Sequence, residues 1–165
     1  MSNVLDAASD QLILSLQIRA VFNGFGRFER PLVGVSLGPY EINMEDADLP
    51  NGAWSMEVIS TQHLAITLDT YLEKNIPNRL NAGQYLDYCC FVRCLRNAFA
   101  HDPYNPIWEL RDEKYRRHYS MDEDWNIDLT DRNGTKVLSD DYCYASGLLE
   151  LARRGKIYVQ NMKSA

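Results

Sequence analysis

The sequence lacks the features of several large classes of protein. No run of apolar residues approaches the roughly 18 that a membrane-spanning helix needs, and the first residues lack the basic segment and apolar run of a secretion signal. Cations are the minority, with 17 Lys and Arg against 23 Asp and Glu and a net charge of −6. Such a chain does not coat nucleic acid or membranes through its overall charge, although a local basic site stays open. We therefore expect a cytoplasmic protein without membrane contact.

Motifs of the common enzyme classes are also missing. The sequence has no P-loop, no HExxH zinc helix and no GxSxG nucleophile elbow. Three of the four cysteines crowd into one segment, as Cys89, Cys90 and Cys94, but no paired CxxC knuckles accompany them. We therefore predict reduced, partly buried thiols, no metal site and no cofactor.

The composition is that of an ordinary globular protein, with 45% hydrophobic residues in 165 residues, which is about one domain. A stretch at about 27–52 contains prolines, glycines and an acidic run, and we expect a long surface loop there with a short extended piece near 32–37. Pro77 ends the helix predicted before it, at 53–75, because proline disfavours helical geometry in the residue that precedes it. Apolar residues recur at helical spacing in four segments, which we predict as helices over 5–22, 53–75, 82–101 and 139–154.

The periodicity changes after the third predicted helix. Trp125–Asp131 alternates apolar and polar residues, and Lys136–Leu138 follows. Asn133 and Gly134 between them are a strong hairpin signal because both tolerate positive φ, so we predict a β-hairpin at about 125–138. Ser139 is a suitable N-cap for the last helix and Gly155 a suitable C-cap. These features predict a single domain over 1–165, mainly α, with a small β-hairpin near the C-terminus.

Polar side chains that suit phosphate chemistry gather at the end of the third predicted helix. Arg93, Asn97 and His101 are spaced i, i+4 and i+8, and therefore share nearly one face. Arg96 lies about 140° round the helix from His101, but its side chain is long enough to reach back. Arginine binds phosphate bidentately, asparagine donates an amide hydrogen bond and histidine moves a proton near neutral pH.

The pattern Arg-polar-x-x-x-His at the end of a bundle helix resembles the signature of the HEPN superfamily of Arg-x(4–6)-His ribonucleases and toxins. Arg96, Asn97 and His101 fit the three motif positions, while the rest of the chain agrees only as helical architecture. The resemblance implies an HEPN-like up-and-down helical bundle with a hairpin insertion. It also implies a metal-independent endoribonuclease, in which two protomers line one cleft and the RNA 2′-hydroxyl attacks the adjacent phosphorus.

The same resemblance implies a role for each of these residues and indicates which partners the protein has. His101 acts as general base or acid, Arg96 stabilises charge on the phosphoryl oxygens, and Asn97 orients His101 or a phosphate oxygen. Arg93 and Tyr104 are further candidates for contacting RNA, with Tyr104 placed to meet a base. RNA and a second copy are the expected partners, together with an antitoxin or other regulatory protein in toxin–antitoxin or phage-defence biology.

Arg111–His118 fits a looser Arg-x(6)-His spacing, although its mixed charges are typical of a solvated face. Its clearest alternative use is a patch that follows an RNA backbone, with Arg116 and Arg117 on phosphates and Tyr115 and Tyr119 available for stacking.

Two other interpretations of the helix end stay open. In the first, Arg96 pairs with Asp102 or another carboxylate while His101 only caps the helix C-terminus. In the second, the domain is a non-catalytic HEPN-like module that binds RNA or another protein.

Overall fold

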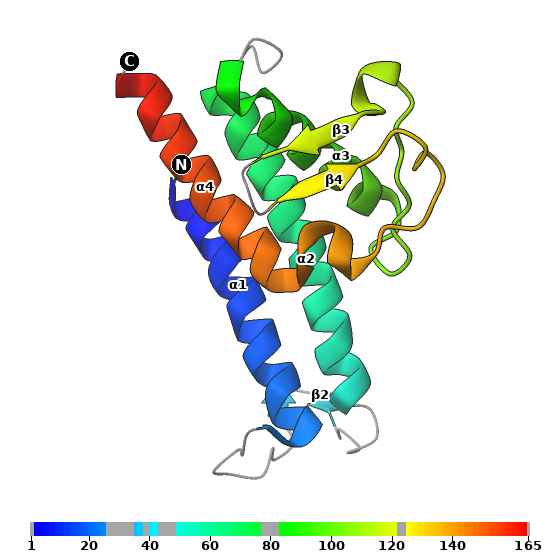
Figure 1. Cartoon of the computed structure of the whole chain (residues 1–165). Helices are drawn as coiled ribbons and strands as arrows, with labels where there is room; N and C mark the ends of the chain where they lie inside the picture. The colour runs from blue at the N-terminus through cyan, green and yellow to red at the C-terminus, as the bar shows by residue number, and fades with distance from the viewer. Residues whose placement is uncertain are drawn as a thin grey trace.

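The computed structural model describes residues 2–25, 35–37, 40–42, 49–76, 83–121 and 125–164. Within them the chain is mainly helical, as the sequence predicts (Figure 1). The long helices are α1 (Ser2–Ala20), α2 (Leu49–Asn75), α3 (Leu86–His101) and α4 (Tyr144–Ser164). Shorter helical turns lie at Val21–Phe25, Gly83–Tyr85, Glu113–Tyr115 and Ser139–Tyr142.

The described residues also contain two small antiparallel β-ribbons. The first pairs β1 (Val35–Leu37) with β2 (Tyr40–Ile42), within the region expected to be a long loop. The second pairs β3 (His118–Ser120) with β4 (Asn126–Asp128), placing Tyr119 opposite Ile127. The small hairpin near the C-terminus is therefore confirmed.

Successive long helices run in opposite directions, so the bundle is up-and-down (Figure 1). The contacts between the helices show this order. Arg19 near the end of α1 pairs with Glu57 near the start of α2, and Gln62 of α2 donates a hydrogen bond to the carbonyl of Phe99 near the end of α3. Lys156 in the second half of α4 pairs with Asp6 at the start of α1. Polar contacts at both ends therefore fix the alignment of the helices.

One hydrophobic core joins the four long helices to the β3–β4 hairpin. Its central side chain is Phe91 of α3, whose ring centroid lies 6.1–6.2 Å from the rings of Trp108, Tyr119 and Trp125. The α3 helix is consequently buried over more than the single stripe that its apolar spacing suggested. The cysteines of α3 are reduced and buried, as predicted, and burial raises the pKa of the Cys94 thiol to about 12.

Helix α2 begins four residues earlier than the sequence pattern predicts. Its first turn includes Pro50, which is compatible with a helix start because the N–H that proline lacks has no intrahelical partner there. Asn51, which precedes the predicted start of the helix, therefore lies inside it. The end of α2 at Asn75 matches the prediction.

Helix α4 continues ten residues beyond its predicted end. Gly155, expected to be the C-cap, lies buried within the helix, where Tyr88 and Leu68 approach its Cα. The hydroxyl of Tyr88 donates a hydrogen bond to the carbonyl of Leu151 at 2.6 Å. This glycine therefore permits close packing of α4 and does not end the helix. No described helix is long and apolar enough to cross a membrane.

The strand pairing of the hairpin differs from the prediction. The strand expected at Trp125 onwards is present as β4, but its partner is β3 and not Lys136–Leu138. The turn at Gly134 has the expected positive φ of 77°. It returns the chain to Trp108, and Lys136 forms an isolated bridge with Ile107. The three residues of β3 alternate in burial, with a fully buried Tyr119 between exposed His118 and Ser120.

The close approach at Gly155 is testable by adding one methyl group. A Cβ there would lie 2.7 Å from the Tyr88 hydroxyl oxygen and 3.0 Å from Leu68 Cδ1. Gly155→Ala should destabilise the fold by about 2 kcal/mol through overpacking, despite the better helix propensity of alanine. The expected fall in Tm is about 4–8 °C by thermal denaturation.

Gly52 of α2 is the matched control, because a Cβ there would meet nothing within 4 Å. Gly52→Ala should leave Tm unchanged or raise it, through helix propensity alone. Equal behaviour of the two variants would show that Gly155 is not a packing constraint.

Candidate functional site

The end of α3 is fixed by the turn that follows it. His101 is the last residue of the helix, and Asp102 is extended, with φ −146° and ψ 101°. The Asp102 carboxylate accepts hydrogen bonds from the backbone N–H groups of Tyr104 and Asn105, at 2.9 and 3.1 Å. The chain therefore leaves the helix axis immediately after His101 and leaves the imidazole side chain 65% exposed.

Asn97 and His101 line one surface hollow of about 260 Å³. They lie one helical turn apart on α3, as the sequence spacing requires. The segment between α3 and β3 supplies the other lining residues, Glu109, Arg111, Asp112 and Tyr115. The hollow thus combines an imidazole, an amide, a guanidinium, carboxylates and a phenol.

Arg96 is joined to the hollow through Asn97. Its Nη1 donates a hydrogen bond to Asn97 Oδ1 at 3.1 Å. Most arginines in the described part of the chain form ion pairs with carboxylates, but Arg96 pairs with no carboxylate of those residues. The interpretation in which Arg96 pairs with Asp102 is therefore not what the structure shows. A guanidinium held by a neutral side chain keeps its positive charge for an external anion.

Glu109 lies between His101 and Arg111. Its Oε2 is 3.4 Å from His101 Nε2 and 3.2 Å from an Arg111 Nη. The Arg111 side chain is 83% exposed, so the carboxylate holds two groups that both face solvent. Imidazole and guanidinium are also groups that can bind a phosphate, and here both contact the same carboxylate.

Glu109 is a residue of the hollow that was not predicted from the sequence, although its outward direction could have been. Trp108 and Leu110 are fully buried, and residues that alternate along an extended segment point to opposite sides. Glu109 and Arg111 must therefore share the opposite, outward side. The position of His101 beside them depends on the turn at Asp102, which the sequence does not specify.

Arg93 is engaged away from the hollow. Its guanidinium is 2.5 Å from Asp69 of α2, which is only 2% exposed, and 3.7 Å from Glu73. Arg93 therefore joins α3 to α2, and the contact with RNA that its place on the Asn97 face suggested stays a prediction. The helical face that Arg93, Asn97 and His101 share therefore meets two environments. Arg93 lies against α2, and His101 is open to solvent.

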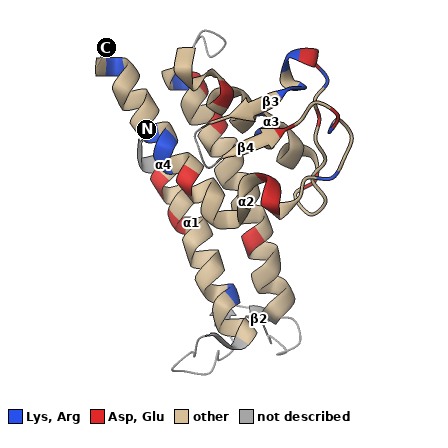
Figure 2. Cartoon of the chain, in the orientation of Figure 1, with Lys and Arg blue, Asp and Glu red and all other residues tan. Residues whose placement is uncertain are grey.

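The patch predicted at Arg116 and Arg117 is also largely occupied within the protein. Arg116 Nε donates to the carbonyl of Leu110 at 2.8 Å, and Arg117 pairs with Asp87 at 2.8 Å. The Arg117 guanidinium lies 5.0 Å from the ring centroid of Tyr119, which is fully buried and unable to stack on a base. Figure 2 shows both signs of charge along the segment between α3 and β3, which is the mixed pattern of a solvated face.

Tyr104, in contrast, is exposed. Its side chain is 46% accessible, and its ring centroid lies 5.3 Å from that of Trp54 at the start of α2. Tyr104 therefore keeps part of its aromatic surface open to solvent.

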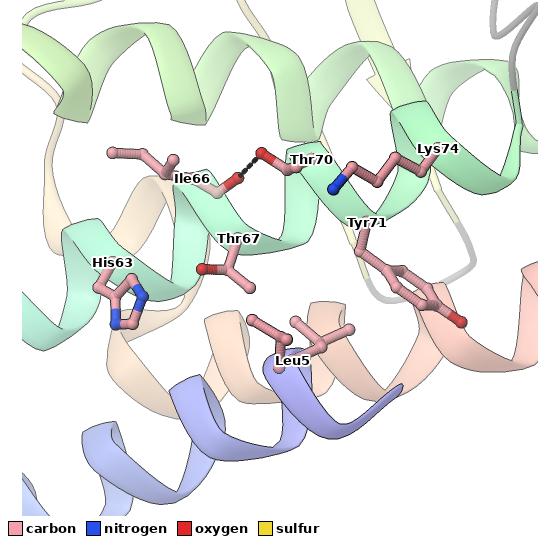
Figure 3. A pocket seen from close by; sticks show the side chains of 8 residues that line it. Leu5, His63, Ile66, Thr67, Thr70, Tyr71 and Lys74 are labelled. Atoms are coloured by element: carbon pink, nitrogen blue, oxygen red, sulfur yellow. Dashed lines mark hydrogen bonds between the residues drawn. The ribbon is translucent and has the colours of Figure 1, made fainter. Parts of the chain in front are cut away.

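A separate apolar groove of about 250 Å³ lies between α1 and α2 (Figure 3). Leu5 of α1 lines it together with side chains of α2 that include His63, Thr67 and Tyr71. The Thr70 hydroxyl donates to the Ile66 carbonyl at 2.9 Å, so it is used within the helix. This face of α2 differs from the one that bonds to α3, and it is independent of the hollow at His101.

No protein-family model, curated protein or solved structure matches this chain. Within the described residues, no three or more His, Cys, Asp or Glu side chains are grouped so that they could hold a metal ion. The residues of the hollow and Arg96 are therefore the features of this chain that bear on its function.

The role of Arg93 separates a structural from an RNA-binding assignment. Arg93→Met removes the guanidinium that pairs with the buried Asp69 carboxylate. We expect a loss of about 2 kcal/mol, below the ~3–5 kcal/mol of a fully buried pair because the Arg93 side chain is 32% exposed. Thermal denaturation should show the lower Tm, whereas RNA affinity of the folded variant should be unchanged.

Arg153, which pairs with Glu150 on the surface of α4, provides the control. Arg153→Met should change Tm little. A weaker RNA affinity in Arg93→Met with no loss of stability would show instead that Arg93 contacts RNA.

Proposed function

We propose that this chain is a metal-independent endoribonuclease of the HEPN type, with Arg96, Asn97 and His101 as its active-site residues. The observation that carries the proposal is an Arg96 guanidinium that no described carboxylate neutralises, joined through Asn97 to the hollow of an exposed histidine. In a protein of net charge −6, such a local cation is what an RNA phosphate requires.

The chemistry follows from these groups. His101 takes the proton of an RNA 2′-hydroxyl, the 2′-oxygen forms a bond to the adjacent phosphorus, and the bond from phosphorus to the 5′-oxygen breaks. The products are a 2′,3′-cyclic phosphate and a 5′-hydroxyl, and the leaving oxygen requires a proton. Arg96 stabilises the charge that develops on the phosphoryl oxygens.

Glu109 has a defined part in this scheme. We propose that a carboxylate in contact with one imidazole nitrogen orients the ring and leaves the other nitrogen for the substrate. With Nε2 of His101 facing Glu109, Nδ1 is the nitrogen that meets the 2′-hydroxyl. Arg111, on the other side of Glu109, is placed to bind the next phosphate of the chain.

One imidazole cannot both accept the 2′-hydroxyl proton and protonate the leaving oxygen in a single step. We therefore propose that a second copy of the chain supplies the acid, so that two His101 side chains serve one composite site. On the same family resemblance, we propose that an antitoxin or similar regulatory protein restrains the activity.

A second candidate function is RNA binding without cleavage. The contact of Glu109 with both His101 and Arg111 favours it, because a carboxylate that stays there blocks a phosphate from the imidazole. The two candidates share the RNA ligand and differ in whether the RNA backbone is cut.

His101→Ala tests the nuclease directly. The side chain is mainly exposed, so the variant should fold with an unchanged Tm and lose at least about 10²-fold in cleavage rate. The assay incubates wild-type and variant protein with RNA in EDTA and analyses the fragment ends. Wild type should give 2′,3′-cyclic phosphates.

His118 is the matched control, since it is also exposed and belongs to the looser Arg-x(6)-His pattern. His118→Ala should cleave like wild type. Cleavage lost in His118→Ala and retained in His101→Ala would move the site to β3. RNA binding by wild type with no cleavage would favour the second candidate.

A further inference from the structure

Two half-exposed aromatic side chains are in contact beside the end of α3. The rings of Trp54 and Tyr104 have centroids 5.3 Å apart and planes tilted by 51°. Trp54 is 43% exposed and Tyr104 is 46% exposed. Burial of a large aromatic side chain is strongly favourable, so a pair that stays half in solvent leaves ring surface for a ligand.

Trp54 is far more exposed to solvent than the other tryptophans of the chain. Trp108 is fully buried and Trp125 is 7% exposed. Within the part of the chain that the structure describes, neither the indole N–H of Trp54 nor the hydroxyl of Tyr104 forms a hydrogen bond. The pair therefore offers ring faces together with two free hydrogen-bonding groups.

The position of the pair is set by the turn that ends α3. Tyr104 follows His101 by three residues, so their Cα atoms are at most about 11 Å apart. The two hydrogen bonds to the Asp102 carboxylate hold the turn, and Tyr104 with it. Trp54 reaches the same place from the start of α2, whose alignment with α3 is fixed by Gln62 and Asp69.

We propose that Trp54 and Tyr104 form a stacking subsite for an unpaired base of single-stranded RNA, next to the nucleotide whose phosphate meets Arg96 and His101. This inference rests on the proposed function for the phosphate site and adds the recognition of a base. Aromatic rings stack on any base through its π-face, and the strength of stacking is sequence-tolerant. Single-stranded segments are therefore the substrate class, because a base inside a duplex cannot reach the rings.

The chemistry of the neighbourhood favours RNA over an apolar protein surface as the occupant. The pair stands beside an unneutralised guanidinium and an exposed imidazole, which together suit a polyanion. Its own donors also suit the carbonyl and ring nitrogen acceptors of a base. A purely apolar partner would leave all of these groups buried without a bond.

Because Trp108 and Trp125 are buried, Trp54 is the tryptophan whose fluorescence a bound base can quench by direct contact. We would titrate a short oligouridine, made with 2′-O-methyl groups to prevent cleavage, into the full chain and follow tryptophan emission. Stacking on Trp54 should quench it. Trp54→Phe should retain much of the affinity, measured with a labelled oligonucleotide, but lose the quenching.

Tyr104→Ala should weaken binding by about 5- to 150-fold, the range for one stacked base, whereas Tyr104→Phe, which keeps the ring and loses only the hydroxyl, should weaken it less. Tyr144 is the control, because it is 60% exposed on α4 and unconnected to the pair. Tyr144→Ala should bind the oligonucleotide normally. Melting curves establish that each variant is folded.

The outcomes distinguish this inference from the proposed function. Binding of the labelled oligonucleotide without quenching, or with full affinity in Tyr104→Ala, overturns the stacking subsite even if the protein cleaves RNA. Quenching by the oligonucleotide in a protein that cleaves no RNA supports the subsite and contradicts the nuclease. Loss of self-association in Trp54→Ala with unchanged RNA affinity would assign the pair to a protein interface and overturn the inference.

Discussion

The division of α3 into buried faces and one polar face that reaches solvent at His101 sets the position of the candidate site. Phe91 and its neighbours pack against the hairpin and the segment before it, while the helix is aligned on α2 through Arg93 and Asp69. These contacts fix the rotation of α3 about its axis. The remaining polar positions, Asn97 and His101, then face the hollow formed with Glu109 and Arg111. The position of the site is thus a consequence of core packing.

The charges of the molecule explain how an acidic protein can hold an anion site. Cations outside the site are mostly matched by nearby carboxylates, as Arg19 is by Glu57 and Arg117 by Asp87. Such pairs create little field at a distance, because opposite charges a few ångströms apart cancel. The field that remains comes from unmatched groups, and in the described residues Arg96 is one of them. A negative total charge and a phosphate site are therefore compatible.

Much of the fold could be predicted from the sequence, because helical periodicity and proline positions record which faces are buried. The four long helices and the presence of a late hairpin follow from such local signals. The pairing of β3 with β4 and the packing of Gly155 against Tyr88 do not, since they depend on residues far apart in the chain. At the site, the grouping of Asn97 with His101 follows from helix geometry. The pairing of Arg93 with Asp69 and the insertion of Glu109 arise only from the tertiary arrangement.

The central claim is that the unneutralised Arg96 makes the end of α3 a site for an RNA phosphate. The most direct test is the single-turnover cleavage rate and RNA affinity of Arg96→Gln, with Arg153→Gln as a variant that removes a paired surface arginine. The account predicts a rate about 10²–10³-fold lower and weaker RNA binding in Arg96→Gln, with both quantities unchanged in Arg153→Gln. Wild-type rate and affinity in a folded Arg96→Gln protein would contradict it.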